Sequence, residues 1–356
     1  MKNEINMSLL KRIVGIQSLS SESNQCFKAL KLIEVEIKNK NIPVIIDFNE
    51  GIPFLIAGNL DKASILFLNH IDIVPAKTNQ FKLVQKENIL FGRGVLDMKG
   101  PLTAALGAFL KLWKSGNRNV VFAVSSDEET GGFKGAAFLA KNVFKNIKLA
   151  IIPDGGGENL VLIQKAPFHI KICAKGKSAH GSRPWEGKNA AENLLKCCFQ
   201  IIKNINSVSH DQTTAIISQF HSGEATNMVP DKAEAIIDIR IKKEPEIKKL
   251  INKIEVVTQN CHCDWEKIDE PLFFETKENN IFVKKWAKAF REIHSKEVKL
   301  IIESGASDAR FLWKELKIPI IVTSAIGGGA HSNKEWADLD SLNKLSETIV
   351  EFINSL

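Results

Sequence analysis

Short runs of consecutive apolar residues are the feature that most constrains how this chain can fold. Residues 65–69, 119–125 and 149–153 are such runs, and each is typical of a strand that is buried on both faces. Segments with apolar residues at helical spacing, 24–40 and 101–114, lie before and between these runs. Strands that alternate with helices predict an α/β fold with a mostly parallel sheet and helices on both of its faces.

The middle of the chain has a different pattern. Residues 168–175 alternate apolar and polar side chains, which is the period of a half-exposed strand. Three more strands are expected at about 213–221, 232–241 and 263–268, and two helices at about 188–205 and 244–258. The resulting order β-α-β-β-α-β is that of a ferredoxin-like unit.

The C-terminal part returns to the first pattern, with a helix, an apolar strand at 318–323 and a closing helix. A chain of 356 residues is also long enough for two domains. We therefore expect one α/β domain formed by residues 1–164 and 276–356. Residues 165–275 are expected to form an inserted α+β domain of the ferredoxin-like type.

Composition and charge exclude several classes of protein. The net charge is +7, but the lysines are scattered and are not interleaved with stacking aromatic residues, so we expect no binding to nucleic acid. We expect no membrane partner either, since no apolar run is long enough to span a bilayer, and the N-terminus does not resemble a signal peptide. Six cysteines without a disulfide spacing predict reduced thiols and a cytoplasmic protein.

Side chains that can bind metal ions follow the apolar strands. Four of the five stretches that carry them come directly after a short apolar run, and the fifth precedes the helix at 101–114. The residues concerned are His70 and Asp72, Asp97, Glu128 and Glu129, Asp154, and His331.

Each stretch alone also has an ordinary structural reading. A lone histidine near a carboxylate is usually structural, Asp97 resembles a helix N-cap, and adjacent glutamates often form a solvated turn. The combination is more informative, because ligands of open α/β sheets bind at the carboxyl ends of the strands. Two histidines and three carboxylates suit zinc, with one carboxylate able to bridge two ions. Glu128 then remains for proton transfer.

Four motifs in this set resemble those of the M20 metallopeptidase family, and the resemblance covers nearly the whole chain. The motifs are His70-x-Asp72, Asp97-Met98-Lys99-Gly100, Glu128-Glu129 and Ala330-His331-Ser332. The resemblance implies two zinc ions per subunit, for which cobalt or manganese can substitute. It implies that His70 and Asp154 hold one ion, that Glu129 and His331 hold the other, and that Asp97 bridges them.

The same resemblance implies roles for the remaining residues. Glu128 would be the general base, Asp72 would support His70, and the Asp97–Met98 peptide bond would be cis. The segment 176–184 resembles one that carries a histidine, here His180, into the active site of a partner subunit. The inserted domain would therefore be a lid and dimerisation domain of a homodimer.

Further motifs resemble the substrate-binding segments of the family. Asn227 lies in one of them, and Arg240 occupies the place of an arginine that binds a substrate carboxylate. Ser307 and Arg310 resemble a further loop on the substrate side. From the residues alone, His180 could be a loop histidine, Arg240 a strand-end charge and Arg310 a structural residue.

The expected activity is hydrolysis of an amide bond in a small peptide or N-acyl amino acid that carries a free carboxylate. Asp154 favours a peptidase or aminoacylase within the family, whereas the run 331–335 looks more like that of a carboxypeptidase. Deacylation of N-succinyl or N-acetyl amino acids, as in lysine and arginine biosynthesis, is the alternative. A metal-free binding protein on the same fold is an alternative from another class, but it would require an eroded ligand set.

Overall fold

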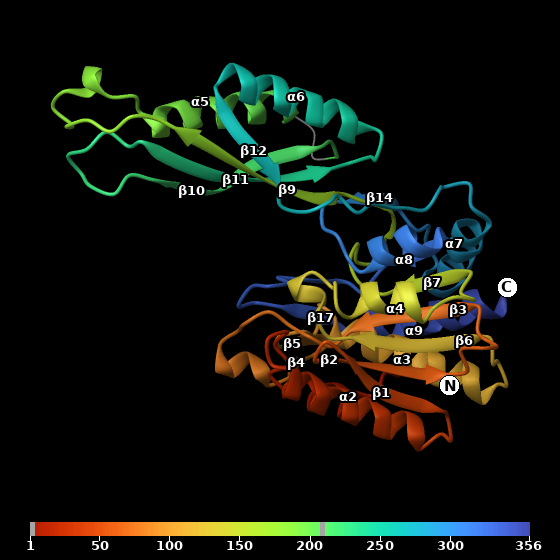
Figure 1. Cartoon of the computed structure of the whole chain (residues 1–356). Helices are drawn as coiled ribbons and strands as arrows, with labels where there is room; N and C mark the ends of the chain where they lie inside the picture. The colour runs from red at the N-terminus through yellow and green to blue at the C-terminus, as the bar shows by residue number, and fades with distance from the viewer. Residues whose placement is uncertain (1–3, 207–210) are drawn as a thin grey trace. The chain divides into compact units, whose positions relative to one another are not determined.

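The chain divides into two compact units in the computed structural model, which describes residues 4–206 and 211–356 (Figure 1). The first unit contains the chain up to Ile163, together with Phe274–Glu303 and Ser307–Leu356. The second unit contains Gln164–Phe273 and the short segment Ser304–Ala306. None of the helices in the described residues combines the length and the apolar character that crossing a membrane requires.

The first unit is built on a mixed sheet with the order β1-β2-β6-β3-β7-β15-β8-β13, in which β14 also pairs with β8. Only its centre is parallel: β6, β3, β7 and β15 run in one direction, whereas β2 and β8 are antiparallel to their neighbours. The strands are β1 (Val44–Asn49), β2 (Ile52–Gly58), β3 (Ile65–His70), β6 (Val120–Ser125), β7 (Leu149–Ile152), β8 (Leu160–Gln164), β13 (Phe274–Glu275), β14 (Leu300–Glu303) and β15 (Ile320–Val322). The four parallel strands are the apolar runs of the sequence, and every residue in them is buried.

Helices cover both faces of this sheet. Phe67 of β3 and Phe122 of β6 pack against Phe109 of α3, whereas Phe54 of β2 packs against Phe138 of α4. Phe54 and Phe122 point to opposite faces, because Phe122 is paired with Ala57, three residues along β2. The helices of this unit are α1 (Met7–Val14), α2 (Ser23–Lys38), α3 (Lys99–Lys114), α4 (Ala136–Asn142), α7 (Ile281–His294), α8 (Ala309–Leu316) and α9 (Leu339–Asn354).

A second small sheet in this unit was not expected from the sequence. Its order is β16-β17-β5-β4, and it joins the region before α3 to the region before α9. The strands are β4 (Val84–Lys86), β5 (Ile89–Phe91), β16 (Gly327–Gly328) and β17 (Trp336–Asp338). Because β17 pairs with β5, the loop that follows β5 and the loop between β16 and β17 are held close to each other.

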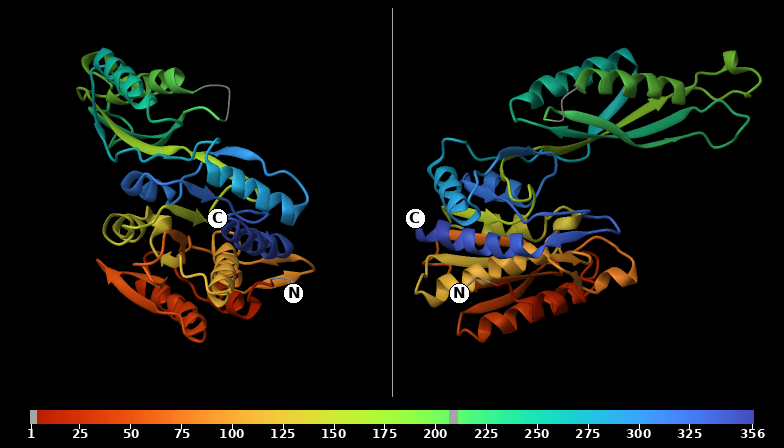
Figure 2. Two further views of the ribbon diagram at one scale, coloured as in Figure 1. Left: turned by 90° about the vertical axis from the view of Figure 1, so that its right-hand side faces the viewer. Right: turned by 180° about the vertical axis from the view of Figure 1, so that it is seen from behind.

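The second unit is a four-stranded antiparallel sheet with the order β10-β11-β9-β12. Along the chain its elements are β9 (Ala166–Lys175), α5 (Ala190–Ile205), β10 (Thr214–Ser222), β11 (Lys232–Ile241), α6 (Glu246–Asn260) and β12 (Cys263–Lys267). Both helices lie on the same side of the sheet (Figures 1 and 2). The alternating burial of β9 and β11 follows from this arrangement, since one face packs on the helices and the other is open.

Candidate metal centre

Loops at the carboxyl ends of the central strands carry the predicted metal-binding side chains. His70 is the last residue of β3, Glu129 lies in the 3₁₀ turn Glu128–Thr130 after β6, and Asp154 follows β7. Asp97 precedes α3, and His331 lies between β16 and β17. The parallel strands end at one edge of the sheet, so their polar residues converge there.

Two groups of potential ligand atoms form at this edge. His70, Asp97 and Asp154 make one group, and Asp97, Glu129 and His331 make the other. Within each group the ligand atoms lie within 4.8 Å of one another. Asp97 belongs to both groups: its Oδ1 is 3.2 Å from His70 Nε2, and its Oδ2 is 3.0 Å from His331 Nε2.

The orientation of His70 suits a metal ligand. Its Nδ1 faces Asp72, 3.1 Å from the backbone oxygen and 3.3 Å from the side-chain Oδ1. This contact turns Nε2 toward Asp97, yet Nε2 is buried and has no hydrogen bond of good geometry. A zinc-binding histidine typically has one ring nitrogen held by an acid, while the other faces the metal. His70 fits this pattern, because its buried Nε2 lacks a hydrogen bond and faces carboxylates.

Asp72 also fixes the loop that follows β6. Its Oδ1 accepts a hydrogen bond from the Glu128 backbone N–H (3.2 Å), and its Oδ2 accepts one from the Glu129 N–H (3.0 Å). The hydroxyl of Ser20 donates to Oδ2 at 2.6 Å. Burial alone would raise the pKa of Asp72, but its contact with His70 lowers that pKa below the ordinary value. Asp72 therefore remains ionised and orients both His70 and the glutamate loop.

The acids of the centre repel one another strongly. Burial first, and then the charge of Asp97, raise the pKa values of Glu129 and Asp154 to about 7. Asp97 differs, because burial raises its pKa but its close contacts with the rings of His331 and His70 outweigh burial and lower that pKa below the ordinary value. A divalent cation among these groups would relieve the repulsion, so the donor set fits zinc in chemistry and in charge.

Glu128 lies beside the two groups but is a member of neither. Burial is the main cause that raises its pKa well above the ordinary value, and the negative charges of Asp154, Asp308 and Glu129 add to it. A carboxylate with a raised pKa beside a metal site can accept and return a proton near neutral pH.

The backbone has two unusual conformations at the ligands. The Asp97–Met98 peptide bond is cis, as the family resemblance implied. His331 has a φ of 62°, and Gly329, two residues before it, has a φ of 70°. A residue without a Cβ adopts this left-handed conformation easily, which suits a glycine at position 329.

The loop before α8 supports the glutamate loop. Ser307 is buried, and the neighbouring Asp308 accepts a hydrogen bond from the Ser125 hydroxyl at 3.0 Å. Burial raises the pKa of Asp308 to about 7. The guanidinium of Arg310 donates to the backbone oxygen of Gly131 at 2.8 Å and is itself buried. Asp308 was not among the predicted site residues, although it lies next to Ser307 in the same motif.

The second unit contains the other three predicted residues. His180 is exposed, and its Nδ1 contacts the Ser182 hydroxyl at 2.8 Å. Asn227 lies on the neighbouring segment, since its backbone oxygen accepts from the N–H of Gly181 at 2.7 Å. Arg240 lies near the far end of β11 from that segment, and its Nε is 2.9 Å from Asp238 Oδ1. The structure thus brings His180 and Asn227 together, but not Arg240 with them.

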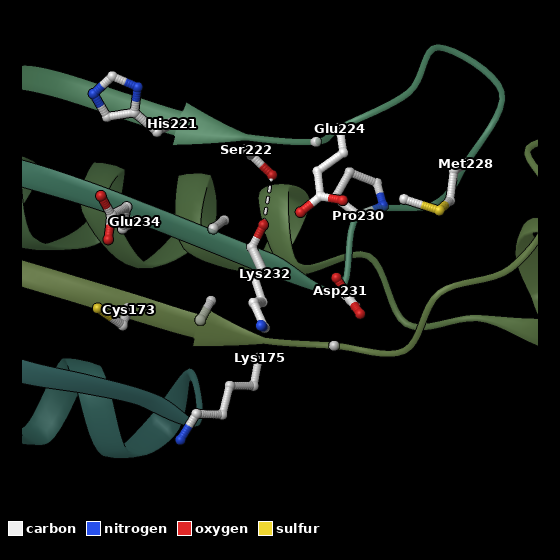
Figure 3. A pocket seen from close by; sticks show the side chains of 14 residues that line it. Cys173, Lys175, His221, Ser222, Glu224, Met228, Pro230, Asp231, Lys232 and Glu234 are labelled. Atoms are coloured by element: carbon white, nitrogen blue, oxygen red, sulfur yellow. Dashed lines mark hydrogen bonds between the residues drawn. The ribbon is translucent and has the colours of Figure 1, made fainter.

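The second unit also contains a cavity that sequence analysis did not identify (Figure 3). Its volume is about 570 Å³, and it lies where β9, β10 and β11 meet the loops at their ends. Lysines and acids both line it, including Lys175, Lys232, Glu224, Asp231 and Glu234. This mixed charge does not favour a particular ligand, and none of the predicted site residues belongs to the lining.

Comparisons with known proteins agree with the motifs. A profile of the family described as Peptidase family M20/M25/M40 matches residues 66–355. A succinyl-diaminopimelate desuccinylase of Rickettsia bellii (strain RML369-C) is 24% identical and aligns with 98% of this chain and 96% of its own. Among solved structures, a tripeptidase of Staphylococcus aureus Mu50 has a TM-score of 0.81 at 22% identity, covering 99% of both chains. Aminopeptidase PepT of Bacillus cereus ATCC 10987 has a TM-score of 0.79 at 19% identity, covering 98% of both. At these identities the two structures establish the shared fold.

Proposed function

The chain belongs to peptidase family M20/M25/M40 and is a hydrolase of that family, and we propose that it is a two-zinc enzyme that cleaves amide bonds. Its substrate would be a small peptide or N-acyl amino acid with a free carboxylate beside the scissile bond. The observation that supports this proposal is the pair of three-residue donor groups that share Asp97. Two ions joined by one carboxylate are a common arrangement in hydrolases.

The proposed ligands divide between two ions. His70 and Asp154 would hold one, Glu129 and His331 the other, and Asp97 would bridge them. When bound, zinc ions lower the pKa of a water molecule and polarise the scissile carbonyl, and cobalt or manganese could take their place.

Glu128 is the proposed general base. It would take a proton from the attacking water and return it to the leaving nitrogen, a role that suits a partly buried carboxylate with a raised pKa. Asp72 would keep His70 in the tautomer that leaves Nε2 free for metal, since it lies against Nδ1.

Residues of the second unit are proposed to bind the substrate. Arg240 would pair with the substrate carboxylate while Asp238 holds its guanidinium in place. His180 would stabilise the developing oxyanion in the active site of a partner subunit. Asn227, on the neighbouring segment, would contact the substrate. Residues 165–275 would then be the lid and dimerisation domain of a homodimer.

The loop before α8 is proposed to act on the substrate side of the centre. Ser307 would line that side. Arg310 would act through the glutamate loop, because its guanidinium is buried and bound to Gly131.

Deacylation of N-succinyl or N-acetyl amino acids is a second candidate. It is favoured by the desuccinylase of Rickettsia bellii, which aligns with nearly the whole chain. A solved structure that shares the fold is a tripeptidase, so small peptides belong in the same test.

One substrate panel distinguishes these candidates. The zinc-loaded protein is incubated with di- and tripeptides, N-acetyl and N-succinyl amino acids and folyl-type amides, and released amine is measured. We expect one class to be cleaved at least tenfold faster than the others. If protein that carries two ions cleaves nothing in the panel, the amide hydrolase is contradicted. If the protein binds no zinc, cobalt or manganese after reconstitution, the metal centre is contradicted and a binding protein is favoured.

We also propose a cytoplasmic location. All six cysteines are free in the structure, although five of them lie in the second unit: Cys173, Cys197, Cys198, Cys261 and Cys263. Free thiols persist in a reducing compartment. Fractionation of the source cells, with the protein followed by antibody, would test this location.

A further inference from the structure

We propose that Glu335, acting together with Arg93, is a positioning residue that joins the loop of Asp97 to the loop of His331. This inference rests on the proposed metal centre and adds two residues that touch neither substrate nor ion. The two side chains come from segments 242 residues apart in the sequence. Their contacts form a continuous connection between the bridging ligand and a terminal ligand.

The carboxylate of Glu335 holds the Asp97 loop by its backbone. Its Oε1 accepts hydrogen bonds from the N–H of Leu96 at 3.0 Å and from the N–H of Asp97 at 3.2 Å. Its Oε2 accepts from Arg93 at 2.6 Å. Since the side chain of Glu335 is completely buried, water does not compete for these oxygens.

The guanidinium of Arg93 extends the connection to the His331 loop. One terminal nitrogen donates to Glu335, and the other donates to the backbone oxygen of Ser332 at 3.1 Å. Ser332 directly follows His331, and its oxygen also accepts from the Gln80 side chain at 3.1 Å. The planar fork of an arginine suits this role, because it can bind two acceptors in fixed directions.

His331 depends on such support more than the other ligands do. Its side chain is 54% exposed, so packing holds it weakly. It also lies in a left-handed conformation within a glycine-rich loop, outside any strand. A ligand that is exposed and carried by a loop needs hydrogen bonds from neighbouring groups to keep its geometry.

Stability alone explains the buried pair poorly. Replacing a buried ion pair with apolar side chains of similar size is often neutral or stabilising, because desolvation opposes the attraction of the charges. An apolar pair cannot, however, accept from the Leu96 and Asp97 amides or donate to Ser332. What Arg93 and Glu335 provide, and an apolar pair would not, is therefore a set of hydrogen bonds that holds the two loops in position.

The test compares ion binding in wild type and in the double variant Arg93→Met/Glu335→Leu. Zinc affinity is measured by competition with a chromophoric chelator, and ligand geometry by the visible spectrum of the cobalt form. We expect the metal-free double variant to melt within a few degrees of wild type. The affinity of the double variant for the more weakly bound of its two ions should be about 10- to 100-fold lower than in wild type. This is the usual effect of losing a group that orients a metal ligand. The cobalt spectrum should change accordingly.

Two controls make the comparison specific. Glu34→Gln alters another buried carboxylate, which is paired with Lys31 and Lys38 on α2, and should leave both affinities unchanged. Arg93→Lys keeps the charge but replaces the planar fork of two donor nitrogens with a single nitrogen, so it should lower the affinity for the same ion. This single variant decides the matter if the double variant does not fold.

The possible results separate this inference from the proposed function. If wild type binds two ions and folded Arg93→Lys or the double variant binds them equally well, the positioning role is wrong and the metal centre stands. If wild type itself binds fewer than two ions, the metal centre is rejected and the role of Glu335 with it. A loss of affinity confined to the Arg93 and Glu335 variants supports both.

Discussion

Substituting the two adjacent glutamates separately gives the sharpest test of the proposed chemistry. Glu128→Gln and Glu129→Gln make the same chemical change at neighbouring positions of one turn. The contacts that hold this turn on Asp72 come from backbone N–H groups, so both variants retain them. Only Glu129 belongs to a donor group, and therefore the two variants should fail in different ways.

The expected size of the Glu128 effect follows from its role. A general base contributes about 10²- to 10⁴-fold to the rate, which corresponds to roughly 3–5 kcal/mol of transition-state stabilisation. Glu128→Gln should lose this factor in kcat and retain two ions, because it supplies no ligand atom to either group. Glu129→Gln should lose affinity for the ion shared with His331 and Asp97.

The assay measures kcat and metal content on the same preparation of each variant, with the best substrate from the panel. Glu128→Gln with full metal content and nearly full kcat would assign proton transfer to another group. Glu128→Gln that loses an ion as readily as Glu129→Gln would show that Glu128 is a ligand, and the proposed division of roles would be wrong.

Three further predictions follow from the site and its surroundings. A chelator should abolish hydrolysis and lower the melting temperature, and added zinc, cobalt or manganese should restore both. The melting temperature changes because ions that bind only the folded protein stabilise it. Full activity in excess chelator would refute the metal centre. Mixing inactive Glu128→Ala with inactive His180→Ala should restore activity once subunits exchange, because one site of each heterodimer is then intact; continued inactivity after proven exchange would show that His180 does not act across a dimer. Burial lowers the pKa of His294 to about 4, against about 6.5 in the unfolded chain, so only the unfolded state is protonated between these values. Protonation of His294 in the unfolded state should therefore take up to about 3 kcal/mol from the free energy of unfolding of the metal-free protein as the pH drops through this window, whereas the buried acids with raised pKa values act in the opposite direction. In urea titrations the difference in stability between wild type and His294→Gln should shift against wild type as the pH falls; a difference that does not change with pH would refute this assignment.

The sequence was most informative where burial is complete. Every residue of β3, β6 and β7 is buried, so these strands appear in the sequence as unbroken apolar runs, and the polar residue that follows each run is conspicuous. This is why His70, Glu129 and Asp154 could be predicted as candidate metal ligands from the sequence. The prediction of a parallel sheet held only for its centre, because β2 and β8 pair with their neighbours in antiparallel direction.

The small sheet and the contacts behind the ligands could not be predicted in the same way. β16 is only Gly327–Gly328, and two glycines have no periodic pattern of burial. Arg93 and Glu335 lie in polar, glycine-containing stretches, where charged residues usually face solvent. Their burial results from a pairing between distant segments, which a single sequence does not reveal.

The position of each proposed ligand relative to its strand explains why some features of the site could be predicted and others could not. His70 is the last residue of β3, and Asp154 comes two residues after β7. The hydrogen bonds between these parallel strands therefore fix the backbone positions from which both side chains extend. Asp97 and His331 lie in loops whose nearest strands, β5 and β17, belong to the small sheet. Loops without an internal ladder have more conformational freedom, and the pair of Arg93 and Glu335 binds the backbone of both of these loops. Ligands that a sequence places easily are thus those anchored on the main sheet, whereas ligands on loops depend on buried polar partners that only the folded chain brings together.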